Sequence, residues 1–459
     1  MIGEGASGRR RGSAAWFRMI AVVACVLAAW GFTADSAEAA YEGVASCAGS
    51  TCHGRSEGDG KIVRQDELVH WQDPASQGGA HSRAYAVLAG PRGAQIAASL
   101  GLGPATSAPA CLGCHSTAAP AGQRGERFQQ AEGVGCESCH GEATRWIATH
   151  FAVPATHEAN IAQGMKRLES PAVRAGVCLD CHFGSAGSGQ FVSHRMMAAG
   201  HPRVAFELDL FSSLQQHWDE DADYVQRKGR TDSVRMWAVG QALAVQRSTS
   251  LFAQPGLGTQ GLFPEFYFFD CHSCHRTIDD RAERKLTFQV NAERPIPFGT
   301  PPYNDENIIM LSAVAKALAP GHAVAFDNAA RSFHAAMGKG RSDAIAAGGR
   351  LSAAAGALAN ALSAGTYGGD SAFTVVSTIS SQAISPRFTD YTGSQQAVMA
   401  VDTMLNALVK QGRVTVGAAA GIRGHINRAY DAVKAPNSYN PGAFRASLGE
   451  AARAIGTLR

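Results

Sequence analysis

Cysteine and histidine are concentrated in five short stretches of the chain, and four of these share one spacing. The four read Cys-x-x-Cys-His, while the first has a longer gap between its cysteines. The stretches are Cys47–His53, Cys111–His115, Cys136–His140, Cys178–His182 and Cys271–His275. Two thiols at this spacing can bond to the vinyl groups of one porphyrin, and the adjacent histidine can ligate its iron. The pattern therefore predicts covalent attachment of haem c.

Three other uses of cysteine explain the pattern less well. A zinc site needs paired Cys-x-x-Cys units but no histidine after each second cysteine. A thioredoxin-like redox motif would occur once, and a disulfide framework would not repeat one pentad. Of the 11 cysteines only Cys25 lies outside the motifs. We therefore predict five haem c groups, attached through Cys47, Cys52, Cys111, Cys114, Cys136, Cys139, Cys178, Cys181, Cys271 and Cys274, with His53, His115, His140, His182 and His275 as proximal iron ligands.

A second axial ligand on each iron would decide what the haems do. Two strong ligands make a low-spin electron carrier, whereas an open position allows catalysis or ligand binding. The candidates lie in short helical or turn-like stretches near the motifs, and they are His81, His150, His194, His201 and His217. We expect an open iron, if one exists, at the variant first motif or at the fifth, where distal candidates are fewest.

The remaining histidines are weaker candidates for iron ligation. His70, His157 and His272 lie near the motifs, and His272 is badly placed for its own haem because it lies inside the fifth motif. The others, His322, His334 and His425, lie in a helical region where a single histidine is usually a packed or surface residue. Methionine can also ligate haem iron, but Met196 and Met197 have the spacing of core side chains.

Arginine and aromatic side chains accompany the candidate ligands. An arginine fork suits a carboxylate, so haem propionates are possible partners of Arg83, Arg145, Arg195 and Arg203, and ordinary solvated charge is the alternative. The aromatic run at residues 263–269 precedes the fifth motif. It fits packing on a haem face, and it also fits a short apolar strand.

Composition divides the chain into three parts and predicts a mainly α-helical protein. Residues 40–303 have weak periodicity, as expected of a cytochrome c domain with little regular core, wrapped around five haems that supply its apolar surface. Residues 304–459 lack cysteine, are rich in alanine and have helical periodicity, for example at Leu351, Leu358 and Leu362. Glycine and proline breaks divide this part into about six helices, which we interpret as a helical bundle domain.

Residues 1–39 have the features of a signal peptide. Basic residues at 9–11 precede an apolar run at 19–32, and Ala37-Glu38-Ala39 gives a small-x-small cleavage pattern. A lipoprotein signal at Cys25 and an uncleaved anchor are the alternatives. We expect export to the periplasm, with membrane association possible only through this segment. The formal net charge of +3 gives no argument for nucleic acid binding.

Four phrases in the chain resemble the multihaem cytochromes c of the cytochrome c-554 family. They are the first motif followed by HSRAYAVL, then GVGCESCHG, SHRMMAAGHPRVAFELD, and FPEFYFFDCHSCH before the last haem. The resemblance implies stacked and perpendicular haem pairs, mostly bis-histidine ligation, and distal roles for His81, His150 and His201. This chain departs from the four-haem pattern, because it has five motifs and a helical part that the resemblance does not cover.

These observations support one function and leave two others open. The first is a periplasmic electron carrier that moves single electrons along five haems, between partners such as a membrane quinol dehydrogenase or other cytochromes. The second is a multihaem oxidoreductase that acts on hydroxylamine, nitric oxide or a sulfur oxyanion at one five-coordinate haem. The third is a structural subunit of a larger redox complex. The chain lacks the Cys-x-x-Cys-Lys motif of nitrite-reducing relatives, which argues against that activity.

Overall fold

A computed structural model describes residues 1, 3, 40–58, 63–187, 189–258, 265–275, 294–296, 300–383 and 391–459. The predicted signal peptide, apart from residues 1 and 3, lies outside this part of the chain. The protein is mainly helical, as predicted, and the described residues contain two isolated β-bridges but no strand. None of the described helices is long and apolar enough to span a membrane.

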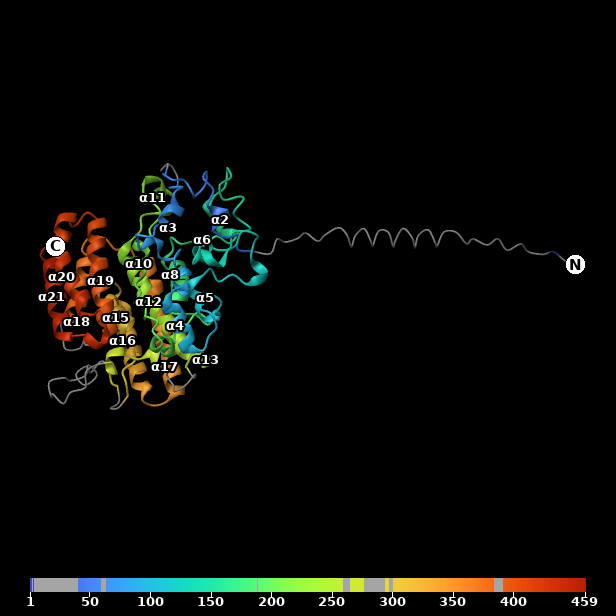
Figure 1. Ribbon diagram of the computed structural model, residues 1–459. Coiled ribbons are helices and arrows are strands. Elements are labelled where there is room, and N and C mark those ends of the chain that lie inside the picture. The colour runs from blue at the N-terminus through green and yellow to red at the C-terminus, as the bar shows by residue number, and fades with distance from the viewer. Residues whose placement is uncertain are drawn as a thin grey trace.

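The N-terminal part of the protein consists of short helices and turns (Figure 1). Glycine, proline and polar residues interrupt its sequence, so few runs are long enough to form a regular helix. Its helices are α2 (Val44–Cys47), α3 (Glu67–Gln72), α4 (Pro91–Leu100), α5 (Pro109–His115), α6 (Cys136–His140), α7 (His157–Ala162), α8 (Pro171–His182), α9 (His194–Ala198), α10 (Leu208–Leu214), α11 (Ala222–Lys228) and α13 (Pro255–Gly258).

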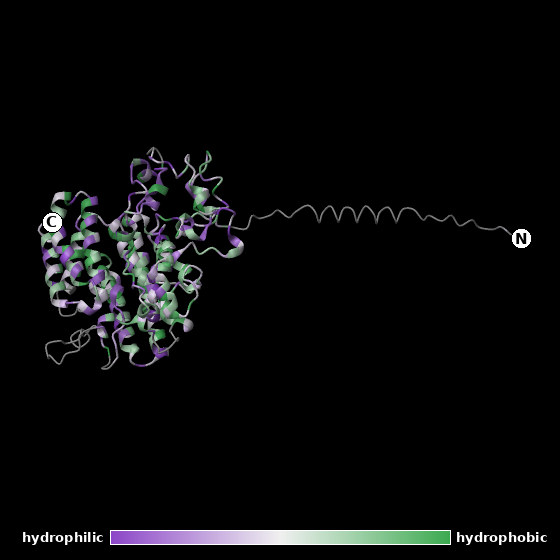
Figure 2. Ribbon diagram, in the orientation of Figure 1, coloured by the Kyte–Doolittle hydropathy of each residue, from purple (hydrophilic) through white to green (hydrophobic). Residues whose placement is uncertain are grey.

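One long helix, α12 (Ser233–Ala253), runs through the middle of the molecule (Figure 1). It begins where Asp232 accepts a hydrogen bond from the backbone N–H of Arg235, which is a regular N-terminal cap. Buried residues lie on nearly all of its sides, including Val234, Trp237 and Phe252. Hydrophobic residues gather along the central helices, whereas the N-terminal loops carry many hydrophilic residues (Figure 2).

The C-terminal part consists of longer helices that share one hydrophobic core with α12. Leu351, Leu358 and Leu362, the face predicted from periodicity, are all buried in this core. Phe326, Phe333 and Phe444 are buried there too. The helices are α15 (Glu306–Leu318), α16 (Pro320–Met337), α17 (Arg341–Ala364), α18 (Ser371–Ala383), α19 (Tyr391–Lys410), α20 (Val416–Ala432) and α21 (Pro441–Gly456).

Polar side chains join the two parts at a junction formed by residues 206 and 207 and helix α19. The Glu207 carboxylate accepts a hydrogen bond from the Thr403 hydroxyl at 2.8 Å, and the Gln396 amide donates to the Phe206 carbonyl at 2.9 Å. Because α12 and Phe268 also enter the C-terminal core, the hydrophobic packing continues across residue 303. The predicted division of the chain into domains at residues 303 and 304 stays a prediction.

Candidate haem-binding sites

Histidine rings meet in five pairs, and each pair contains one motif histidine and one of the five distal candidates. The ring centroids lie 6.1–6.4 Å apart in all five pairs. The pairs, in the order of the motifs, are His53 with His150, His115 with His201, His140 with His217, His182 with His81, and His275 with His194. The first and fifth motifs, where an open iron was expected, have partners as the others do.

The separation of the rings fits one metal ion between each pair. A metal bonded to two imidazole nitrogens at about 2 Å each holds the ring centroids about 6 Å apart, since each centroid lies ~1 Å behind its nitrogen. Within the described residues, no group of three or more His, Cys, Asp or Glu side chains could hold a metal ion. A pair of histidines is the set that a porphyrin iron needs, because the macrocycle supplies the other ligands.

Short helices place the cysteines and histidine of three motifs. Helices α5, α6 and α8 each end at the motif histidine, so the two cysteines lie about one turn apart on the same helix face. Pro109 and Pro171 begin α5 and α8 at a position where proline is favoured. Glu137, inside the third motif, is buried and accepts hydrogen bonds from the backbone N–H groups of Gly43 and Ala143, which fixes this loop.

None of the ten motif cysteines, all of which lie in the described part of the chain, forms a disulfide, and cysteines of different motifs approach one another. The Cys47 thiol and burial raise the pKa of Cys136 well above its usual value. Cys114 and Cys181 are also neighbours, because the Cys181 thiol donates to the Gly113 carbonyl at 3.7 Å. The first motif therefore adjoins the third, and the second adjoins the fourth.

Helix α9 and the turn after it position two distal candidates. The backbone N–H of His194 donates to the Glu265 carboxylate at 2.7 Å, which ties the start of α9 to the segment before the fifth motif. At the other end, Gly200 has a φ of 113°, a left-handed conformation that favours glycine. Arg92 donates to the Gly200 carbonyl, and the turn directs His201 toward the second motif.

Burial keeps several of the paired imidazoles uncharged. It lowers the pKa of His140 to about 3, with a smaller contribution from His217. It also lowers the pKa of His182 to about 4, with a contribution from His81. A histidine must be neutral to bind a metal, so these rings are suited to iron ligation at neutral pH.

The Nδ1 atoms of the paired rings have different hydrogen-bond partners. Four donate to backbone carbonyl oxygens at 2.7–2.8 Å, which leaves Nε2 available for a metal. These bonds are His115 to Ala84, His150 to Ile147, His201 to Pro202, and His217 to Gln215. Two rings differ: Nδ1 of His53 faces the Glu67 carboxylate at 3.0 Å, and Nδ1 of His182 is buried with no hydrogen-bond partner in the described structure.

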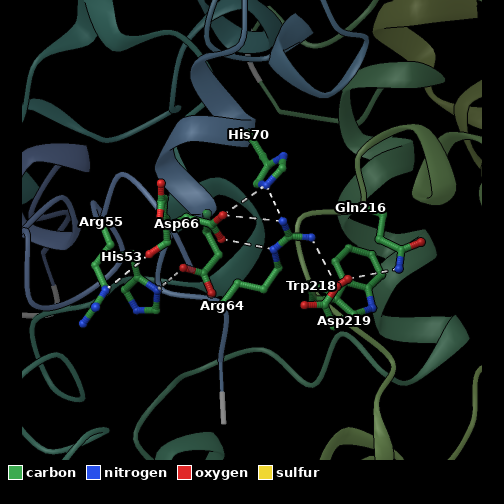
Figure 3. A network of polar contacts seen from close by, with 10 residues as sticks. His53, Arg55, Arg64, Asp66, His70, Gln216, Trp218 and Asp219 are labelled. Carbon is green, nitrogen blue, oxygen red and sulfur yellow. Dashed lines mark hydrogen bonds and ion pairs between the residues drawn. The ribbon is translucent and has the colours of Figure 1, made fainter. Parts of the chain in front are cut away.

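A polar network surrounds the start of α3, beside the first motif (Figure 3). The Arg64 guanidinium donates to Asp66 at 3.1 Å and to Asp219 at 3.2 Å, and it also contacts His70. The pKa of Asp66 is lowered because the attraction of Arg64 outweighs the effect of burial. The network ties α3 to the segment that carries His217, the partner of His140.

Four of the other histidines have partners that account for them without iron. His157 contacts the Glu169 carboxylate at 3.0 Å, and His425 contacts Glu450 at 3.0 Å. His334 is buried and contacts Asp305 at 2.8 Å. His272 donates to a backbone carbonyl in the C-terminal part, that of Pro436.

The arginines proposed for propionates are largely engaged with the protein. Arg83 donates to the carbonyls of Asp73 and Ser76, and Arg195 donates to the Leu100 carbonyl. Arg203 pairs with Glu306 at 2.7 Å. A buried arginine that the sequence analysis did not single out, Arg174, stacks on Trp218, next to His217.

The aromatic run before the fifth motif forms a turn rather than a strand. Residues 266–268 form a short 3-10 helix, and residues 263 and 264 lie outside the described residues. Phe266 contacts the His194 ring edge-on at 5.4 Å, whereas Tyr267 and Phe268 enter the hydrophobic core. The aromatic run therefore contacts both the ring of His194 and the hydrophobic core.

Comparison with known proteins identifies the segment that carries the first three motifs. No curated protein and no solved structure matches the chain significantly. The family model of cytochrome c554 and c-prime matches residues 47–141. The cysteine motifs and the paired histidines agree with this match, since proteins of this kind bind haem covalently and transfer electrons. This segment of the chain is therefore similar to cytochrome c554 and c-prime.

Proposed function

We propose that this c-type cytochrome carries single electrons along five covalently attached haems, each ligated by one histidine pair. The observation that carries the proposal is that every motif histidine has a second histidine at one separation, 6.1–6.4 Å between ring centroids. Two strong axial ligands leave no position for a substrate. The arrangement therefore favours a carrier over an oxidoreductase with one five-coordinate haem.

The contacts between motifs support one continuous row of haems, in the order first, third, fourth, second, fifth. Cys47 and Cys136 join the first to the third, and α6 packs against α8, which joins the third to the fourth. Cys114 and Cys181 join the fourth to the second. His194, at the start of α9, and His201, in the turn after α9, join the fifth to the second. In this row the first and fifth haems are the ends.

The protein holds and insulates the iron sites. Haem supplies a reversible one-electron iron couple, and the chain sets its potential through the axial ligands, their hydrogen bonds and burial. Phe206 stacks on His182 at 4.7 Å and Phe211 contacts the same ring edge-on, so the fourth site is enclosed by aromatic side chains. We propose that the protein acts in the periplasm with redox proteins as partners, since members of this family are typically exported.

The spin state of the irons tests the proposal. Optical and electron paramagnetic resonance (EPR) spectra of the oxidised holoprotein should contain only low-spin haem, and nitric oxide or hydroxylamine should not change them. Mass spectrometry should find five haems attached to the chain. A high-spin signal that shifts with nitric oxide would contradict the carrier function and favour the oxidoreductase.

A further inference from the structure

We propose that Glu67 is a positioning residue that lowers the reduction potential of the first haem and makes it the low-potential end of the row. The proposal rests on the ligation of that haem by His53 and His150. It assigns a role to an acidic side chain that no cysteine motif marks, and it gives the row a direction.

The geometry directs the Glu67 carboxylate at a candidate iron ligand. Nδ1 of His53 lies 3.0 Å from Oε2 of Glu67, whose side chain is only 17% exposed. Glu67 begins α3, and the next residue, Leu68, donates its backbone N–H to the His53 carbonyl at 3.0 Å. The first motif and α3 are thus bonded through both main chain and side chain, so the carboxylate is held in place.

Charged side chains surround Glu67, and its carboxylate faces the ring of His53. Figure 3 includes two cations, Arg55 and Arg64, and Arg64 pairs with Asp66 and Asp219. Asp66 is itself buried, which keeps this pairing close and ordered. The Glu67 carboxylate is the acidic group that faces Nδ1 of His53.

No other paired ring has a carboxylate as its Nδ1 partner among the contacts described. Four rings donate to neutral backbone carbonyls, and Nδ1 of His182 has no hydrogen-bond partner among the described residues. The hydrogen-bond partner of a metal ligand changes how strongly that ligand donates electrons, and it thereby changes the properties of the metal. A carboxylate withdraws the Nδ1 proton most strongly, a carbonyl less, and a buried imidazole without a partner not at all.

The expected consequence is a gradient of potential along the row. A more basic imidazole stabilises ferric over ferrous iron, which lowers the reduction potential. The first haem would be the poorest electron acceptor and the fourth, ligated by His182, among the best. An electron received at the first haem would then move inward through the third, so the first site is the place where a donor protein delivers electrons.

A potentiometric titration followed by EPR tests the assignment. The rings of the first pair are near parallel, at 13°, whereas those of the other pairs cross at 41–89°. Near-parallel rings split the iron d orbitals and give a rhombic low-spin signal, so the first haem can be followed separately. In the wild type, this signal should disappear at the lowest potential. A first haem that is not the lowest in potential would overturn the proposal.

The substitution Glu67→Gln keeps the shape of the acceptor and removes its charge. We expect the potential of the rhombic signal to rise by about 59 mV or more, a tenfold change in the ratio of oxidised to reduced haem. Glu169→Gln is the matched control, because Glu169 also contacts a histidine at 3.0 Å and is 17% exposed, but that histidine belongs to none of the five pairs. The control should leave the rhombic signal unchanged.

The outcomes separate this proposal from the proposed function. A high-spin first haem in the wild type would refute the ligation by His53 and His150, and the role of Glu67 with it. A low-spin first haem whose potential does not change in Glu67→Gln, or changes equally in Glu169→Gln, would refute the role of Glu67 alone. A selective rise with the low-spin spectrum retained would support it.

Discussion

The N-terminal and C-terminal parts of this protein obtain their stability in different ways. In the C-terminal helices, alanine, leucine and phenylalanine side chains form one continuous core with α12. In the N-terminal part, the buried hydrophobic clusters are small, such as the one that joins Leu88, Ala97 and Ala105. The histidine pairs bring distant segments together there, as do polar contacts such as those of Arg64 with Asp219 and of Glu137 with Gly43. The C-terminal part is therefore stabilised by the packing of its own side chains, whereas the N-terminal part is organised around the haem that the chain must bind.

Loss of one attached haem should produce the largest change in the relative stability of the N-terminal and C-terminal parts. In the double variant Cys136→Ala with Cys139→Ala, the third of the proposed haems cannot attach, and the N-terminal part loses a cofactor at an interior position in the proposed row. Folding that depends on a metal commonly draws on the order of 10 kcal/mol from it. Limited proteolysis should show cleavage within residues 40–230 and protection of residues 304–459. Equal resistance of both parts would show that the N-terminal part packs without its cofactor.

A cavity in the C-terminal core should cost less, and it should leave the haems unchanged. Phe333 is fully buried, so Phe333→Ala should lower the free energy of unfolding by about 3–5 kcal/mol. Denaturant unfolding followed by circular dichroism measures this loss, and the low-spin optical spectrum should persist. The exposed Val416 provides a control, since Val416→Ala should change stability by less than about 0.5 kcal/mol. A loss of haem signal in Phe333→Ala would mean that the two parts are not separable.

Removal of one distal histidine should change one haem and little else. In His150→Ala, the first iron loses its second ligand, and a high-spin signal that binds nitric oxide should appear at the expense of the rhombic low-spin signal. His157→Ala is the control, because His157 pairs with Glu169 rather than with a motif histidine. A wholly low-spin spectrum for His150→Ala would indicate that another residue ligates the first haem.

Per pH unit, the smallest expected effect on stability is a pH dependence at the junction. Burial, with the charge of Asp209, raises the pKa of Glu207 to about 8. The folded protein therefore holds this proton more tightly than the unfolded chain, whose glutamates titrate near pH ~4.3. The stabilisation is fully present below that pH and is lost as the pH rises toward about 8.

Urea unfolding at several pH values checks this dependence. Between pH ~5 and ~8, one such group contributes a slope of about 1.4 kcal/mol per pH unit, and Glu207→Gln should remove this contribution. Glu450→Gln, at an exposed carboxylate near His425, should leave the slope unchanged. An unaltered slope in Glu207→Gln would place the titrating group elsewhere.

The sequence predicted the attachment chemistry well because that chemistry is local. Two cysteines and a histidine in one turn identify a haem site wherever the turn lies. The five distal candidates are the residues that the structure brings to the motifs, but their pairing was not predictable. His150 and His194 lie far along the chain from the motif histidines that they contact, so nearness in sequence could not pair them. The place of an open iron stays a prediction.

Residues that act through another side chain could not be identified from the sequence. Glu67 is 14 residues from His53 and resembles an ordinary acidic residue at a helix start. Arg174 and Glu137 likewise show their importance only through burial. Helical periodicity was the stronger signal, since the predicted leucine face of residues 351–362 is the face that packs in α17. The composition of the chain predicted which part has little regular structure and which part is helical. The contacts that set the properties of the sites depend on tertiary structure.

The order of the two histidines of each pair along the chain has a consequence for the assembly of the protein. Ribosomes make the chain from its N-terminus, so His53, His115 and His140 emerge before their partners. His81 and His194 emerge before theirs. Under the proposed ligation, a chain that emerges from its N-terminus would hold its first three haems in a half-ligated stage, whereas the second ligand of the last two is already present when their motifs emerge. A nascent or truncated chain would therefore expose reactive iron that the finished protein conceals.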